Sequence, residues 1–409
     1  SGPSIVFSYI MAGFACAFSA LAYAELAASI GGCGSAYGYA YAGFGELFAW
    51  IVGWDLLLEY AISVSAVSVG WSGYFNDLLL ALKIHIPNYL VHSPGSGGYF
   101  NLLAAAIIFF LGILLGIGVK SSSRANNVMV AIKLMVLALF IVIASMNLDP
   151  KNWSPFFPFG WSGVMQGAAL IFFAYIGFDA VSTAAEEAIN PQRDLPIGII
   201  GSLAICTLIY IVVAGLLTGV VPYTVLNVPS PVSHTLLLLG YKTAAGLVGV
   251  GAVAGLTTVM LVLYYGLSRV FLAMARDGLL PNFFAVTHHK TRTPIRIIAT
   301  CGLLMLTVAA LVPLDELTEL VNVGTLFAFI VVCTGVIILR YTHPDLPRPF
   351  KTPFMPYVPI LGVISCGYLL INLPWVTMVR FIVWMAIGMI IYFSWGYKNS
   401  SKKIAAVRE

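Results

Sequence analysis

Residues 164–184 read VMQGAALIFFAYIGFDAVSTA, and the rest of the chain is expected to be arranged around them. The stretch is apolar enough to enter a membrane, yet it carries Gly177 and a lone carboxylate, Asp179. A glycine costs about 1 kcal/mol in a helix interior, and an acid inside the membrane is expensive unless it faces a cavity or a partner. Irregular backbone is tolerated at membrane depth only where it is buried in protein or lines a cavity. The stretch therefore predicts a membrane helix that opens near Gly177, with the substrate site of a secondary transporter at the break.

The composition of the whole chain places it in a membrane. Of 409 residues, 60% are hydrophobic and only 9% are charged, and the mean hydropathy is +0.97. A soluble domain has about 25% charged residues, so we expect an all-α polytopic protein in a lipid bilayer. The six histidines all fall between apolar runs and the six cysteines show no metal-ligand spacing. We therefore expect no enzyme, no metal site and no nucleic-acid partner, and no cofactor other than a coupling proton.

About 20 apolar residues are needed to cross a bilayer. By this criterion the sequence predicts eleven spans within a single transmembrane transporter domain, residues 1–397, followed by a tail at 398–409. The predicted spans are 4–26, 45–75, 101–119, 126–146, 162–186, 197–221, 243–272, 295–313, 317–340, 357–373 and 376–397.

The basic residues predict the sidedness of these spans. Most of the 20 lysines and arginines fall on one side, which the positive-inside rule makes cytoplasmic. They are Lys120, Arg124, Arg193, Arg269, Arg276, Lys290, Arg292, Arg296, Arg340, Arg348, Lys351, Lys398, Lys402, Lys403 and Arg408. The C-terminus is thus expected in the cytoplasm of a cell with this protein in its plasma (inner) membrane. Eleven spans then place Ser1 outside, which predicts that a first helix is missing; a genuine eleven-span protein is the alternative.

Four motifs resemble one family of permeases. They are residues 23–75, which begin YAELAASIGGCGSAYGYAYAGFGELF; FFAYIGFDAVSTAAEEAINPQRDLPIGI at 172–199; SRVFLAMARDGLLP at 268–281; and HPDLPRPFKTPFMPYVPILG at 343–362. Together they resemble the amino acid–polyamine–organocation superfamily, and within it the bacterial relatives of cationic amino acid transporters. The resemblance implies a LeuT-like fold of two inverted five-helix repeats with two extra C-terminal helices. It aligns the first span here with the family's second helix, so the family's first helix has no counterpart.

The predicted break suits an amino acid for a simple reason. Carbonyl groups that lose their helical partners can accept hydrogen bonds from an α-ammonium group, and the negative end of the half-helix adds attraction. The resemblance assigns these carbonyls to Phe173, Ala174 and Ile176, beside Gly177, with the Phe173 ring closing over the substrate. From the residues alone, packing against lipid or core is the alternative for Phe173.

Lys133 lies inside the predicted span 126–146, about 9 Å from its cytoplasmic end at 1.5 Å per residue. One hypothesis is snorkelling, in which the stem lies along lipid and the amine reaches the interface. The other is a buried amine that takes up and releases a proton. The resemblance favours the second, because in proton-coupled members a lysine on the matching helix substitutes for a sodium ion. We expect Lys133 and Asp179 to serve proton coupling.

Asp55 and Glu59 are spaced i, i+4 and so share one face of a helix. Two acids that face a cavity would attract a cationic side chain, and we expect Glu59 to select for it. An internal pair with Lys133 or a loop base is the alternative. On the span 243–272, Leu263 is expected to bound the side-chain subsite.

These observations predict a secondary active transporter that imports amino acids, as a proton-coupled symporter of broad or cationic specificity. An uncoupled facilitator or exchanger is one alternative. Another is a non-transporting fragment that binds a partner, since some relatives work with a small accessory membrane subunit.

Overall fold

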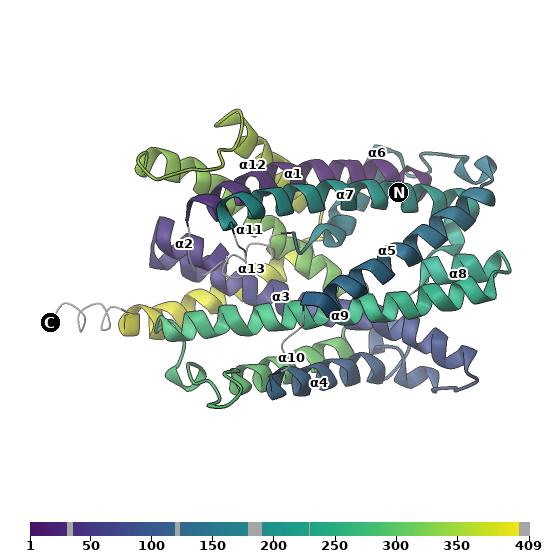
Figure 1. The fold of residues 1–409 in the computed structure, drawn as a ribbon, viewed down its shortest axis with the longest axis horizontal. Coiled ribbons are helices and arrows are strands. Elements are labelled where there is room, and N and C mark those ends of the chain that lie inside the picture. The colour runs from purple at the N-terminus through teal and green to yellow at the C-terminus, as the bar shows by residue number, and fades with distance from the viewer. Residues whose placement is uncertain (31–35, 119–122, 179–189, 229, 401–409) are drawn as a thin grey trace.

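A computed structural model describes residues 1–30, 36–118, 123–178, 190–228 and 230–400. Within these ranges all regular structure is helical (Figure 1). The α-helices are α1 Ile5–Ser29, α2 Ala36–Phe44, α3 Glu46–Ala81, α4 Leu102–Ile117, α5 Ser123–Met146, α6 Gly160–Ile171, α7 Pro191–Val220, α8 Pro231–Leu238, α9 Lys242–Arg276, α10 Ile295–Leu311, α11 Leu314–Thr342, α12 Tyr357–Ile371 and α13 Trp375–Ile391.

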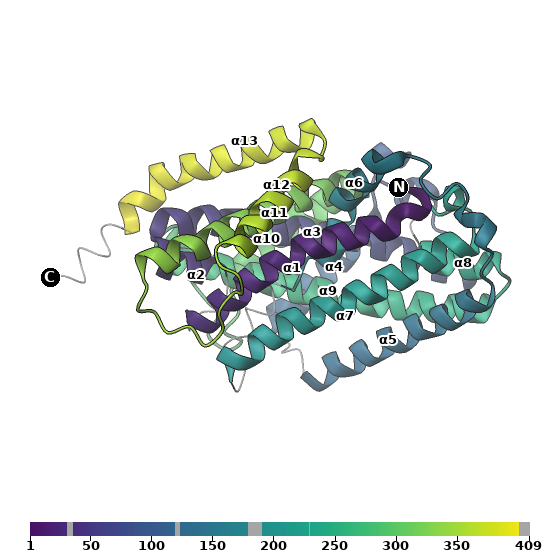
Figure 2. The same ribbon diagram turned by 90° about the horizontal axis from the view of Figure 1, so that it is seen from above.

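The lengths of these helices confirm the all-α membrane class. In the part of the chain that the structure describes, seven helices are long and apolar enough to cross a bilayer, and α4, α10 and α12 are shorter apolar helices. The long helices run roughly along one direction in both views (Figures 1 and 2). The count of eleven spans and the inverted repeats remain predictions.

The element boundaries differ from the predicted spans in informative places. Helix α7 begins at Pro191 and not at residue 197, because a proline fits the first turn, where its missing N–H has no partner to lose. Helix α3 continues to Ala81, beyond the predicted end at 75, and Asp77 near this end accepts a hydrogen bond from Ser230. Helices α2 and α8 are too short to cross a membrane and were not predicted as elements.

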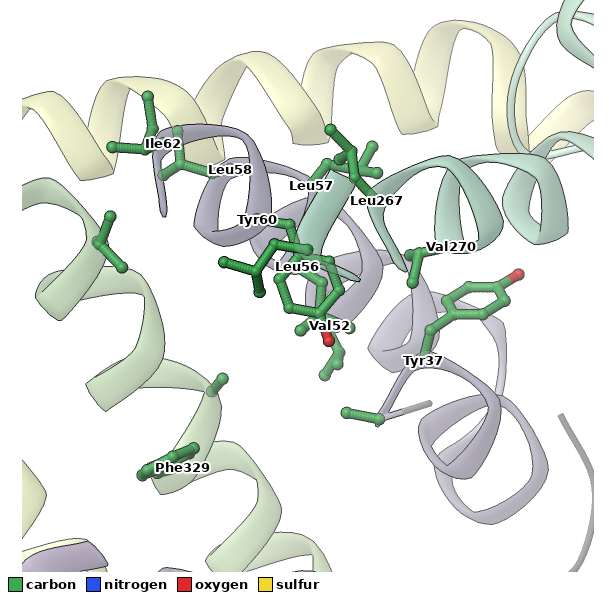
Figure 3. Packing of buried hydrophobic residues seen from close by; sticks show 14 of the residues in the cluster. Tyr37, Val52, Leu56, Leu57, Leu58, Tyr60, Ile62, Leu267, Val270 and Phe329 are labelled. Atoms are coloured by element: carbon green, nitrogen blue, oxygen red, sulfur yellow. The ribbon is translucent and has the colours of Figure 1, made fainter. Parts of the chain in front are cut away.

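Helix α3 forms the centre of the bundle. It packs most extensively against α9 and then against α11. Figure 3 shows Leu57 of α3 next to Leu267 of α9, and Phe329 of α11 belongs to the same buried cluster. Membrane helices gain little from the hydrophobic effect against lipid, so this close packing is what holds them together.

A buried ion pair ties α1 to α11 at the end where most basic residues lie. The Glu25 carboxylate accepts two hydrogen bonds from Arg340, at 2.8 and 2.7 Å, and one from the Thr352 backbone N–H at 2.7 Å. Arg348 lies 3.5 Å from the same carboxylate and donates to the carbonyl groups of Leu339 and His343. The segment that joins α11 to α12 is therefore held firmly against the end of α1.

Candidate substrate site

The helix breaks where the sequence predicts. Helix α6 ends at Ile171, a short 3-10 helix covers Phe172–Tyr175, and Ile176 is extended with φ −63° and ψ 135°. Gly177 follows with φ +113°, a conformation that residues with a Cβ atom rarely adopt. A Cβ atom at Gly177 would meet nothing within 4 Å, so the backbone angle, and not crowding, requires glycine here. Asp179 lies outside the described residues.

Asn322 of α11 satisfies the backbone just before the break. It is fully buried, and its Nδ2 donates to the carbonyl groups of Ala169 and Leu170, both at 2.9 Å. An unsatisfied carbonyl inside a membrane costs several kcal/mol, so Asn322 stabilises the end of α6. The sequence analysis missed this residue, although an asparagine inside the apolar run 317–340 was a signal for it.

Two of the predicted substrate carbonyls have protein partners. The Tyr210 hydroxyl of α7 donates to the carbonyl of Ala174 at 2.8 Å. The Ile176 N–H donates to the carbonyl of Phe173 at 3.3 Å, a long bond. An ammonium group that binds at Ala174 therefore shares this carbonyl with a neutral hydroxyl donor or displaces it. Sequence reasoning did not identify Tyr210, because the contact joins residues 36 positions apart.

Aromatic side chains hold the interrupted segment on two flanks. The Tyr175 hydroxyl donates to the carbonyl of Tyr9 on α1 at 2.8 Å, and the Tyr175 ring meets that of Tyr210 at 5.4 Å between centroids. On another flank, Phe172 and Phe178 lie 5.7 and 5.1 Å from the ring of Phe329 on α11. The predicted Phe173 is half-buried and packs against the same core. The break is thus anchored to α1, α7 and α11.

Lys133 lies between helices and not along open lipid. A Cβ atom placed on Gly255 of α9 would come within 2.8 Å of the Lys133 Cδ, so the lysine stem lies against the α9 backbone. The side chain is half-buried, and Cys206 of α7 is close enough for an electrostatic interaction. This placement favours the buried-amine hypothesis over full snorkelling. Whether the amine couples transport to protons remains a prediction.

The two acids of α3 are buried among helices. Asp55 has no exposed surface, its carboxylate has no hydrogen-bond or ion-pair partner among the described residues, and its Oδ1 would lie 3.0 Å from a Cβ atom on Gly324 of α11. Glu59 is 1% exposed, and Leu263 lies buried on α9, the helix that packs most extensively on α3. The hydrogen bonds that hold the residues around the break instead connect them to α1, α7 and α11. The selecting roles of Glu59 and Leu263 therefore stay predictions.

Within the described ranges, no group of three or more His, Cys, Asp or Glu side chains is placed to hold a metal ion. Among the described residues, five cysteines form no disulfide: Cys16, Cys206, Cys301, Cys333 and Cys366. All of them but Cys206, which is half-buried, are buried, as is typical of cysteines that pack as small apolar side chains.

The amino-acid sequence of the chain matches a known family. A family model described as amino acid permease aligns with residues 1–395. The chain belongs to this family. It is 49% identical over 405 residues to the branched-chain amino acid permease of Bacillus subtilis (strain 168), covering 98% of this chain and 87% of that one. It is 47% identical over 402 residues to the methylthioribose transporter of the same organism, with the same coverage of each chain.

More distant relatives include a vacuolar cationic amino acid transporter of Arabidopsis thaliana, 38% identical over 353 residues, which are 84% of this chain and 59% of the relative. These similarities confirm membership of the amino acid–polyamine–organocation superfamily. The protein is accordingly a multi-pass transporter of the cell membrane and not an enzyme, and its family is one of amino acid transport.

Proposed function

We propose that the protein is a secondary active transporter that imports amino acids by proton-coupled symport and binds them at the interruption of α6. The single observation that carries this proposal is the break itself. It joins a half-helix that ends at Ile171 to an extended residue and a left-handed glycine. In secondary transporters such discontinuous helices form the binding sites for substrates and ions.

The chemistry of the break suits a zwitterion. The C-terminal end of α6 carries the negative end of the helix dipole, which attracts the α-ammonium group. Carbonyl groups at Phe173, Ala174 and Ile176 would accept its three N–H bonds. Because Tyr210 donates to Ala174 in this structure, we propose that the tyrosine hydroxyl takes the place of the ammonium group when no substrate is bound.

The side chain of the substrate is a separate question. One relative transports branched-chain amino acids by name and another, nearly as similar, methylthioribose. Overall sequence similarity to these relatives therefore does not tell which substrate side chain the site accepts. We propose broad or cationic amino acid specificity, with Glu59 attracting a cationic group and Leu263 limiting its size. The i, i+4 spacing of Asp55 and Glu59 supports this, because it places both acids on one face of α3, where together they can attract a cationic group.

We propose that Lys133 and Asp179 carry the coupling proton. The position of the lysine stem against Gly255 of α9 supports a role at the α5–α9 contact. We further propose the LeuT-like repeat arrangement with a cytoplasmic C-terminus, which the clustering of basic residues supports.

Uptake into proteoliposomes made with the full-length protein tests the function. Labelled leucine and arginine are offered with and without an inward proton gradient. A symporter accumulates substrate above the outside concentration only with the gradient. An uncoupled facilitator or exchanger would equilibrate label without concentrating it. If an accessory subunit is required, transport would appear only when that chain is added. In the Glu59→Gln variant, arginine uptake should fall relative to leucine uptake, and an unchanged ratio would remove the selecting role of Glu59.

A further inference from the structure

The first turns of α7 and the segment between α11 and α12 enclose a groove that the proposed transport cycle does not use. In the part of the chain that the structure describes, this groove has a volume of about 640 Å³. One wall is α7 and the other is the pair Pro349 and Phe350. Figure 2 shows the segment between α11 and α12 beside the start of α7. The α7 wall consists of Gln192, Arg193, Pro196, Ile197, Ile200 and Gly201. We infer that this groove binds one anionic phospholipid, with the headgroup phosphate at Arg193 and an acyl chain along Ile197 and Gly201.

The wall opposite α7 is rigidly built. Arg348 and Thr352 bracket Pro349 and Phe350, and both are bound to the buried Glu25 carboxylate. Arg348 also donates to backbone carbonyl groups of its own segment. The groove is therefore a fixed feature between two anchored elements, and a ligand that enters it loses little to reordering of the protein.

The apolar part of the groove continues as a lane along the membrane face of α7. Ile197 is 60% exposed and Leu208 is 64% exposed. They are eleven residues apart, close to three helical turns, so they lie on the same side of the helix. The distance between them is about 17 Å at 1.5 Å per residue, which suits most of the length of an acyl chain. In a membrane protein, such an exposed apolar lane faces lipid tails.

The polar end of the groove carries the charge that an anionic headgroup needs. Arg193 is exposed and has no ion-pair partner among the described residues, and Lys351 is exposed directly after Phe350. Asp194, the neighbouring acid on α7, does not line the groove, and its Oδ2 accepts from the backbone N–H of Asn190. A basic residue near an anionic membrane surface contributes about 1 kcal/mol. The groove thus has a cationic mouth and an apolar floor, which complements a lipid with a negative headgroup.

Native mass spectrometry of the purified full chain tests the inference. The probes are dioleoyl phosphatidylglycerol and dioleoyl phosphatidylcholine, which share their acyl chains. We expect the wild type to retain phosphatidylglycerol in preference. Arg193→Gln should reduce this preference about fivefold, the equivalent of ~1 kcal/mol. Lys290→Gln removes the same charge at an exposed lysine outside the groove and should leave the preference unchanged.

A second variant tests the acyl-chain lane. A Cβ atom on Gly201 would meet nothing within 4 Å, so Gly201→Leu fills the groove without a clash in the protein. It should reduce retention of both lipids. Gly367→Leu on α12 has equally open space and lies outside the groove, so it serves as the matched control. The inference is overturned if wild type shows no preference for phosphatidylglycerol, if each variant behaves as its control does, or if glycerol phosphate without acyl chains binds equally well.

Discussion

Replacing Glu25 by glutamine should destabilise the protein more than any comparable change at an exposed acid. The carboxylate is 2% exposed and accepts from Arg340 at 2.8 and 2.7 Å and from the Thr352 N–H at 2.7 Å. Removing one partner of a buried ion pair typically costs 3–5 kcal/mol, because the other charge is left uncompensated. Because Arg340 is 24% exposed, water can solvate its guanidinium group after the partner is lost, which offsets part of this cost. We expect a loss of about 2–4 kcal/mol.

The assay is thermal unfolding of the purified protein in detergent, followed by intrinsic tryptophan fluorescence. The loss corresponds to a midpoint roughly 2–5 °C lower. Glu316→Gln is the matched control, because Glu316 pairs with Arg380 at 2.7 Å but both side chains are 44% exposed. An exposed pair contributes about 0–1 kcal/mol, so its midpoint should move by no more than about 1–2 °C. Equal shifts in the two variants would refute the reasoning that burial makes the Glu25 cluster strong.

Three further predictions concern transport by the full-length protein. Gly177→Ala should lower uptake at least about fivefold while expression is kept, because holding alanine at φ +113° costs about 1 kcal/mol or more. Gly70→Ala, in open space within α3, should leave uptake intact, and equal uptake by both variants would contradict the prediction. Tyr210→Phe removes the donor that competes with substrate for the Ala174 carbonyl. It should lower KM about two- to fivefold, because substrate binding no longer has to break a hydrogen bond with a net value of ~0.5–1 kcal/mol. An unchanged or higher KM would show that the hydroxyl does not compete. Lys133→Ala should abolish the pH dependence of uptake, and proton-driven accumulation that survives in this variant would exclude the coupling role.

The sequence was sufficient to locate the break, and the reason is local. A glycine inside an apolar run is unfavourable in a helix, and Gly177 does adopt the left-handed conformation for which glycine is suited. The helical class was equally accessible, because composition and apolar run length depend on no tertiary contact. The start of α7 was misplaced because Pro191 and Pro196 are both acceptable first-turn residues by local rules, and only the structure shows which one begins the helix.

The residues that support the break could not be found this way. Tyr210 and Asn322 act through contacts to α6 that join distant parts of the chain, at separations of 36 and about 153 positions. An asparagine or tyrosine in an apolar run signals that some partner exists, but its identity depends on how the helices pack. The same applies to Lys133, because the sequence does not show that its stem lies against Gly255 of α9.

A structure of the full-length protein with a bound amino acid would test the central claim most directly. The account predicts the α-ammonium nitrogen within about 3 Å of carbonyl oxygens among Phe173, Ala174 and Ile176, with the Tyr210 hydroxyl displaced from Ala174. An amino acid bound elsewhere, with the bond from Tyr210 to Ala174 intact, would contradict it.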